Sequence, residues 1–277
     1  MLIRYGFHID LDFAQPSTVV IAMDVHPDRR LDVIAETAYP LLSPQHLHSF
    51  YDLHANLCRR IDTQGGMLSL RCEGVIRDSG LQDPVLPSLR QTPVAQLPDN
   101  TLRYLIASRY CDTDLLGDFA WATFGSIRGG WAKVQAICDF VHGHLTFDYG
   151  KARATRTAAQ AFREREGVCR DFSHLAVALC RCLNIPARYC NGYLGDIGVP
   201  FNPDPMDFNA WFEAYLDGHW HVFDARHNEP RIGRILVARG RDAADVPMIN
   251  SFGQHTLRHF EVITEEVEEA NVLREVA

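Results

Sequence analysis

The sequence predicts an α+β protein, in which an N-terminal β-sandwich precedes a core built from a helix packed on an antiparallel sheet. Near the N-terminus every second residue from Ile3 to Leu11 is apolar, which is the pattern of a half-buried strand. Helical spacing of apolar residues dominates the middle of the chain, up to about residue 184. Strand-like segments return after Ile185, so helices and strands are segregated along the chain, as in α+β folds.

These patterns divide the chain into three parts. Residues 1–80 form the β-rich domain, residues 81–98 carry four prolines and form a linker, and residues 99–277 form the core. In the core we expect a helix beginning at Asp99-Asn100, helices over 131–145 and 157–167, and a helix opened by Cys169. The strands expected there are 187–193, 208–216, 219–225, 232–238 and about 260–264, followed by an acidic tail.

Composition excludes some classes of function. The chain has 277 residues, of which 47% are hydrophobic and 22% charged, as in ordinary globular proteins. Its net charge of −8 argues against a nucleic-acid partner, because affinity for phosphates rests on Lys and Arg. We find no long apolar run, so we expect neither a signal peptide nor contact with a membrane. The eight cysteines form no CxxC pair, which predicts reduced thiols in the cytoplasm.

Cys169 is the first candidate for chemistry. It follows Gly167 at the predicted start of an apolar helix, where the helix dipole favours an anion. We therefore expect a stabilised thiolate that serves as a nucleophile. The alternative is that Cys169 is a small core residue, since free cysteines are often buried.

A hairpin downstream supplies further candidates. Asp217-Gly218 is a signal for a two-residue turn, and the resulting register places Asn209 and Asp224 as diagonal neighbours on one face. A histidine at position 209 would thus be held by Asp224 and presented to Cys169. The same register places His219 and His221 on the opposite face.

Two runs of sequence carry a resemblance to a known family: GVCRDFSHLAVALCRCLNIPARYCNGYLGD and MDFNAWFEAYLDGHWHVFDAR. They resemble the bacterial transglutaminase-like superfamily of cysteine proteases over about residues 98–226. The resemblance implies a papain-like cysteine-nucleophile core, with a β-rich domain of the kind often joined to it before the core. It also implies that Cys169 is the nucleophile and Asp224 the orienting acid, while Asn209 occupies the position of the family's histidine.

Asn209 makes the activity uncertain at the level of the sequence, because an amide cannot accept the proton of a thiol. His227, just beyond the last hairpin strand, is the best substitute base. One hypothesis is a peptidase, amidase or transglutaminase that forms a Cys169 thioester with a peptide or protein substrate. The alternatives are a catalytically impaired relative that binds a peptide or protein partner in its cleft, and a structural module.

No cofactor or metal is expected from the spacing of ligands. The pairs His142/His144 and His219/His221 lack a carboxylate or cysteine partner at ligand spacing. A cluster of arginines near the C-terminus is interpreted as salt-bridged surface, with an anionic substrate as the alternative. Its members are Arg226, Arg231, Arg234, Arg239 and Arg241, followed by Asp242 and Asp245.

Overall fold

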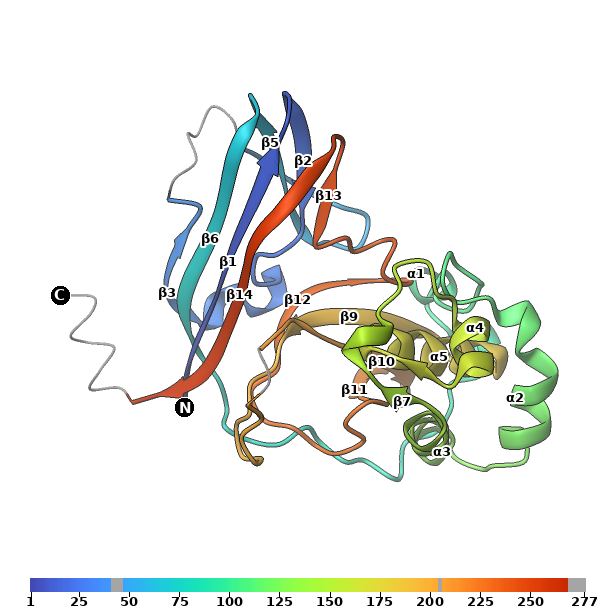
Figure 1. Ribbon diagram of the computed structural model, residues 1–277. Helices are drawn as coiled ribbons and strands as arrows, with labels where there is room; N and C mark the ends of the chain where they lie inside the picture. Colours follow the sequence, from blue (N-terminus) through green and yellow to red (C-terminus); the bar gives the residue numbers. More distant parts are fainter. Residues whose placement is uncertain (41–46, 204–205, 269–277) are drawn as a thin grey trace.

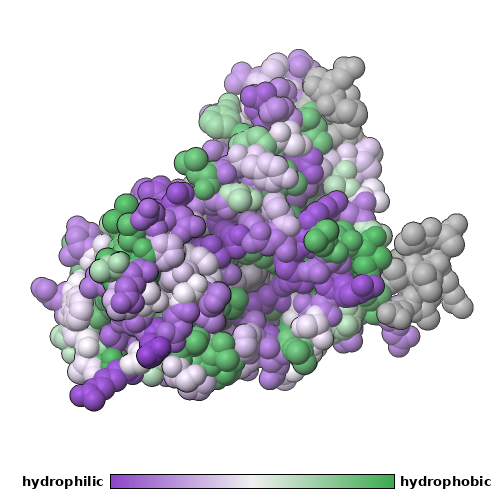
Figure 2. Space-filling model, turned by 180° about the vertical axis from the view of Figure 1, so that it is seen from behind, coloured by the Kyte–Doolittle hydropathy of each residue, from purple (hydrophilic) through white to green (hydrophobic). Residues whose placement is uncertain are grey.

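The computed structural model describes residues 1–40, 47–203 and 206–268. The chain forms two lobes, a β-sandwich and a lobe in which helices cover a third sheet (Figure 1). The predicted α+β architecture with an N-terminal sandwich is therefore confirmed. Hydrophilic side chains gather between the two lobes on the face seen in Figure 2. In the described ranges, the helices are too short or too polar to cross a membrane.

The sandwich consists of two four-stranded antiparallel sheets, ordered β14-β1-β6-β3 and β13-β2-β5-β4. The apolar alternation in β1 turns every second side chain from Ile3 to Phe13 into the core between them. The strands of the first sheet are β1 (Leu2–Phe13), β3 (Val33–Ala38), β6 (Gly66–Arg77) and β14 (His255–Val267). Those of the second are β2 (Ser17–Ile21), β4 (Leu47–Tyr51), β5 (Leu57–Thr63) and β13 (Ile249–Ser251), and the 3₁₀ helix η1 (Pro27–Asp32) precedes β3.

The last two strands differ from the sequence prediction, which placed all residues after 98 in the core. β14 instead pairs with β1 along its whole length, from Leu2 opposite Val267 to Phe13 opposite His255, and β13 pairs with β2 (Figure 1). Without β14, one edge of β1 would present unpaired backbone groups. The core is therefore an insertion between β6 and β13, and only residues up to β12 belong to its sheet.

The core sheet is antiparallel, with the order β11-β10-β9-β12. One face packs against α5 (Cys169–Cys182) and α3 (Gly130–His144). The other face meets the sandwich, where the Tyr193 ring lies 5.3 Å from the Tyr5 ring. The strands are β9 (Ala187–Tyr193), β10 (Asn209–Leu216), β11 (His219–Phe223) and β12 (Ile235–Gly240).

Local sequence signals account for the helices. In α3, expected from the sequence over residues 131–145, the apolar residues at helical spacing are buried, from Trp131 to Val141. Thr157 caps the following helix through a capping box, and Arg165 ends it early, with a left-handed φ of 58°. The remaining elements are η3 (Val94–Gln96), α1 (Asp99–Leu102), η4 (Thr113–Leu115), α2 (Gly117–Phe124), η5 (Tyr149–Lys151), α4 (Ala158–Glu164), and the short parallel pair β7 (Thr146–Phe147) and β8 (Glu166–Gly167).

The β1–β14 pairing gives a first prediction. Val262 on β14 is buried opposite Phe7, so Val262→Ala should lower the free energy of unfolding by roughly 1–3 kcal/mol through lost burial and a cavity. Glu265→Ala on the same strand removes an exposed group and should change it by less than about 0.5 kcal/mol. Urea denaturation measures both. Equal losses in the two variants would contradict the pairing.

Candidate active site

Asp171 fixes the turn that presents Cys169 as the first residue of α5. The buried Asp171 Oδ2 accepts hydrogen bonds from the Val168 backbone N–H at 2.9 Å and from Arg156 Nη1 at 3.0 Å. Glycine is needed at position 167, because a Cβ there would lie 2.6 Å from the Asp171 side chain. Cys169 therefore lies at a helix start whose geometry is set by its neighbours, as the sequence predicts.

The protonation of Cys169 differs from the sequence prediction. Burial raises the pKa of the thiol to about 11, although the Arg226 guanidinium and the backbone N–H groups of Ala210 and Arg170 act in the opposite direction. The nearby Asp207 carboxylate adds to the increase. The expected thiolate is wrong for this site, because lost hydration outweighs the helix dipole. Cys169 is a neutral thiol at pH 7 and needs a base before it can attack a carbonyl.

The hairpin of β10 and β11 has the predicted register. Asp217 and Gly218 have φ values of 43° and 89°, both positive, as a type I′ turn requires. His221 lies on the helix-covered face, with its ring 6.5 Å from that of Trp131. The pairs are Leu216 with His219, Tyr215 with Trp220, Ala214 with His221, Glu213 with Val222 and Phe212 with Phe223.

Asn209 holds an arginine beside the thiol. Its Oδ1 accepts a hydrogen bond from Arg226 Nη1 at 2.9 Å. Its Nδ2 donates to the backbone carbonyls of Leu194 and Asp207, both at 3.3 Å. The Arg226 guanidinium also stacks on Phe147, 3.8 Å from the ring centroid. The Asn209 amide therefore positions the Arg226 guanidinium, but it cannot itself accept a proton.

Asp224 orients His227. Asp224 Oδ2 contacts His227 Nδ1 at 2.8 Å, and Oδ1 accepts the backbone N–H groups of Arg226 and His227, both at 3.0 Å. Within the described ranges no hydrogen bond joins Asp224 to Asn209, so the expected 209–224 contact is replaced by one to residue 227. The Asp224–His227 bond is the arrangement in which a carboxylate fixes an imidazole for proton transfer.

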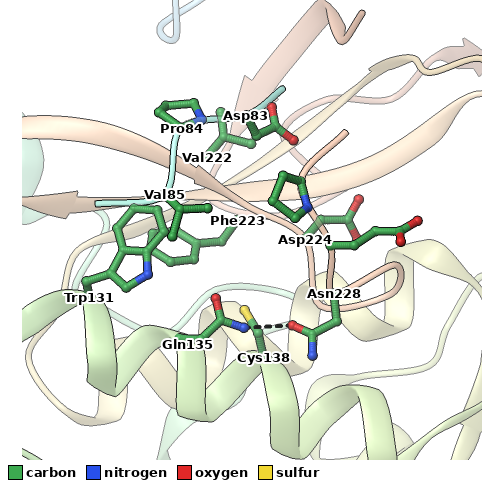
Figure 3. A pocket seen from close by; sticks show the side chains of 12 residues that line it. Asp83, Pro84, Val85, Trp131, Gln135, Cys138, Val222, Phe223, Asp224 and Asn228 are labelled. Carbon is green, nitrogen blue, oxygen red and sulfur yellow. Dashed lines mark hydrogen bonds between the residues drawn. The ribbon is translucent and has the colours of Figure 1, made fainter. Parts of the chain in front are cut away.

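Arg234 ties this carboxylate to the linker. Its Nη2 donates to Asp224 Oδ2 at 2.9 Å, and its Nε donates to Asp83 at 2.8 Å. Burial alone would raise the pKa of Asp224, but the Arg234 charge and the His227 hydrogen bonds outweigh it and hold that pKa well below its usual range. Figure 3 shows the small pocket beside Asp224, where a Gln135–Asn228 hydrogen bond joins α3 to the turn after β11.

A polar pocket of about 70 Å³ lies where these segments meet. Asn209, Arg226 and His227 all line it, so the structure brings together two of the side chains that the sequence singled out, Asn209 and His227. Of these, sequence spacing had placed His227 only loosely, because it lies beyond the strand whose register is known. The other lining residues are Tyr149, Leu194, Asp196, Asn202, Met206, Asp207 and Arg231.

The arginine cluster is mostly ion-paired, as the first of the two sequence interpretations has it, but Arg231 and Arg234 are buried and do not lie at the surface. Arg231 lies 3.8 Å from Asp196, and Arg241 binds Asp245 at 2.8 Å. Arg226 is the exception, because it makes no ion pair within the described ranges. Its charge acts on Cys169 and on the Asp207 carboxylate, both of which it favours in the ionised form. Of the other two arginines, Arg234 pairs with both Asp83 and Asp224, and Arg239 pairs with Asp28.

Comparison with known proteins agrees with this geometry. Residues 123–225 match the family model of the Transglutaminase-like superfamily, a region that contains Cys169, Asn209 and Asp224. The crystal structure of a putative cysteine protease from Cytophaga hutchinsonii superposes with a TM-score of 0.82 and 28% sequence identity, covering 97% of this chain and 91% of that chain. The resemblance inferred from the sequence and the transglutaminase-like fold are both confirmed.

Two of the curated proteins that match the sequence of this chain come from mycobacteria. An uncharacterized protein of Mycobacterium leprae is 30% identical over 116 residues, which is 41% of either chain. An uncharacterized protein of Mycobacterium tuberculosis is 27% identical over 144 residues, or 49% of this chain and 46% of that protein. The chain thus spans less than half the length of the curated relatives it matches.

The position of Arg226 gives the second prediction. Since its charge lowers the pKa of Cys169, Arg226→Gln should raise that pKa further and slow alkylation of Cys169 by iodoacetamide at pH 8 by roughly threefold to tenfold. Mass spectrometry of time-resolved labelling measures the rate. Arg258→Gln, which removes an exposed arginine of the sandwich, is the matched control and should leave the rate unchanged. An unaltered rate in Arg226→Gln would show that the guanidinium does not act on the thiol.

Proposed function

Because residues 123–225 form a transglutaminase-like domain, we propose that the chain is a cysteine hydrolase or acyltransferase of the peptidase or amidase type, acting through a Cys169 thioester. The observation that carries the proposal is the 2.8 Å contact between His227 Nδ1 and Asp224. It supplies the oriented imidazole that Asn209 cannot provide. The similarity to the Cytophaga hutchinsonii protein supports the same class of reaction.

In the proposed reaction, His227 Nε2 takes the proton of the Cys169 thiol, and the thiolate attacks the carbonyl carbon of a peptide or amide. The tetrahedral intermediate collapses as the imidazolium gives its proton to the leaving amine, which leaves a thioester. Water or a second amine then attacks the thioester with the same imidazole as base, and the acid or new amide is released. Asp224 stays ionised and keeps the proton of neutral His227 on Nδ1, so that Nε2 is free to accept.

The groups around Cys169 support the charged states of this reaction. Arg226 places a positive charge near the sulfur, and the backbone N–H of Ala210 favours the thiolate. Negative charge that develops during attack is stabilised by such fixed donors more than by water, because they need no reorganisation. Asn209 contributes by holding Arg226, which makes it a positioning residue in this proposal.

We propose a peptide or protein as the substrate and the cytoplasm as the location. The acyl-transfer chemistry of a cysteine nucleophile suits an amide bond, and the small pocket lined by His227 offers polar groups to such a substrate. All eight cysteines are free thiols, and only Cys169 and Cys182 among them are partly exposed. Unpaired thiols in this number are typical of a reducing compartment.

A second candidate function is a binding protein that has lost catalysis. The raised pKa of Cys169 favours it, because the thiol stays protonated unless a base reaches it. The three hydrogen bonds that engage the Asn209 amide favour it too, since they build a preformed polar surface at the pocket. In this function the pocket would hold a peptide or protein partner without chemical change.

The third prediction tests His227. His227→Ala should lower kcat/KM on peptide or amide substrates by roughly 10²–10⁴-fold, because it removes the base while Cys169 remains. Fluorogenic peptide and amide libraries supply the substrates, and intact-mass spectrometry detects the thioester. Cys169→Ala should abolish thioester formation. The matched control is His219→Ala, an exposed histidine of the same hairpin, which should retain activity within about threefold.

One result would contradict the assignment of His227 as the base, and another would contradict the enzyme proposal itself. Undiminished turnover in His227→Ala would assign the proton transfer to another group. Complete absence of a thioester in the unaltered chain, together with retention of bound peptides, would favour the binding function.

The fourth prediction concerns Asn209→His. A neutral imidazole at position 209 can accept the hydrogen bond that Arg226 now gives to the amide. If His227 is already the base, kcat/KM should change by less than about tenfold, since a second base adds little to a completed proton transfer. Steady-state kinetics of both forms provides the test. A larger gain of activity, accompanied by a lowered pKa of Cys169, would show that the natural chain lacks a working base.

A further inference from the structure

Four side chains that can bind a metal lie together on the first sandwich sheet, outside the site described above. His8 and Asp10 belong to β1, and His259 and Glu261 belong to β14. The register places His8 directly opposite Glu261 and Asp10 directly opposite His259. Their neighbours in β1 are buried in the sandwich core, so these four side chains project from its outer face.

The donor atoms of this cluster converge. His8 Nε2 lies 3.0 Å from Asp10 Oδ1, and His259 Nε2 lies 3.4 Å from Glu261 Oε2. The two imidazole rings are 4.3 Å apart between centroids. One ligand atom each from His8, His259 and Glu261 fall within 4.8 Å of one another. Three ligands from two strands thus already surround one small volume.

We propose that His8, His259 and Glu261, with Asp10 as the fourth ligand, bind a divalent transition-metal ion such as Zn²⁺. Imidazole nitrogens and carboxylate oxygens are the donors that zinc takes in proteins, at roughly 2.0–2.2 Å. At such bond lengths tetrahedral ligand atoms lie about 3.4 Å apart, so small rotations of exposed side chains complete the geometry. The two carboxylates balance the charge of the ion.

The surroundings match this assignment. On the neighbouring strand β6, Ser69 faces Asp10, and its hydroxyl is placed to hydrogen-bond the carboxylate of this fourth ligand. Arg71 of β6 lies directly opposite His8 and brings a positive charge next to the proposed site. Its long exposed side chain can extend into solvent when an ion binds.

Metal binding here has a defined structural effect. The ligands come from the two ends of the described chain, and one ion would bridge β1 to β14. A bridge that closes so long a loop restricts the unfolded chain and stabilises the native state. The bound ion would therefore stabilise the pairing of β14 with β1, and this effect does not depend on the proposed catalysis.

Isothermal titration of ZnCl₂ into the full chain, without a polyhistidine tag, tests the proposal. We expect one ion at this site, and His8→Gln or His259→Gln should weaken its binding by about tenfold or more. His255→Gln, on the same strand β14 but outside the cluster, is the matched control and should bind with unchanged affinity. Since all variants keep the same cysteines, zinc bound by thiols contributes equally to each titration.

A second measurement needs no variant. Modification of histidines by diethyl pyrocarbonate, mapped by mass spectrometry, should be suppressed by Zn²⁺ at His8 and His259 by about fivefold and left unchanged at His255, because bound nitrogens do not react. Affinity within twofold of the unaltered chain in His8→Gln/His259→Gln would overturn the site. Modification of His8 and His259 that zinc does not slow would overturn it as well.

Discussion

The site depends on the hydrogen bonds and the ion pair of the buried Asp224 carboxylate. It accepts two backbone N–H groups of the turn after β11, the His227 imidazole and the Arg234 guanidinium. An ionised group removed from water is stable only when such donors act together. Through Arg234 the same carboxylate also fixes Asp83 of the linker, so the segment that joins the two lobes and the imidazole that faces the pocket share one anchor.

Burial acts on Asp224 and Cys169 alike, with opposite outcomes. Asp224 has enough donors to remain an anion, whereas Arg226 and a few backbone groups are too weak to ionise Cys169. A thiol that is neutral at rest reacts slowly with oxidants and alkylating agents, because the thiolate is the reactive form. In the proposed reaction the sulfur would therefore stay unreactive until a base takes its proton.

Sequence reasoning succeeded where the signal is local. The Asp217-Gly218 turn fixed the hairpin register, and helical spacing identified the buried face of α3. It failed for β14, because pairing with β1 depends on contacts between distant parts of the chain. The contact of Asp224 with His227 was not predicted, because His227 lies beyond the end of β11, where the alternation of side chains between the two faces of a strand no longer applies. The ligands around His8 were missed since no spacing rule relates residue 8 to residue 259.

The placement of β14 also bears on how the chain is made. β1 leaves the ribosome before the core and its neighbour β14 leaves after it, so the sandwich remains unfinished while the entire core is synthesised. Contacts of such large sequence separation form slowly, and an open strand edge can pair with other chains in the meantime. The β1–β14 pairing that completes the fold therefore also lengthens the time during which the nascent chain can aggregate through the open edge of β1.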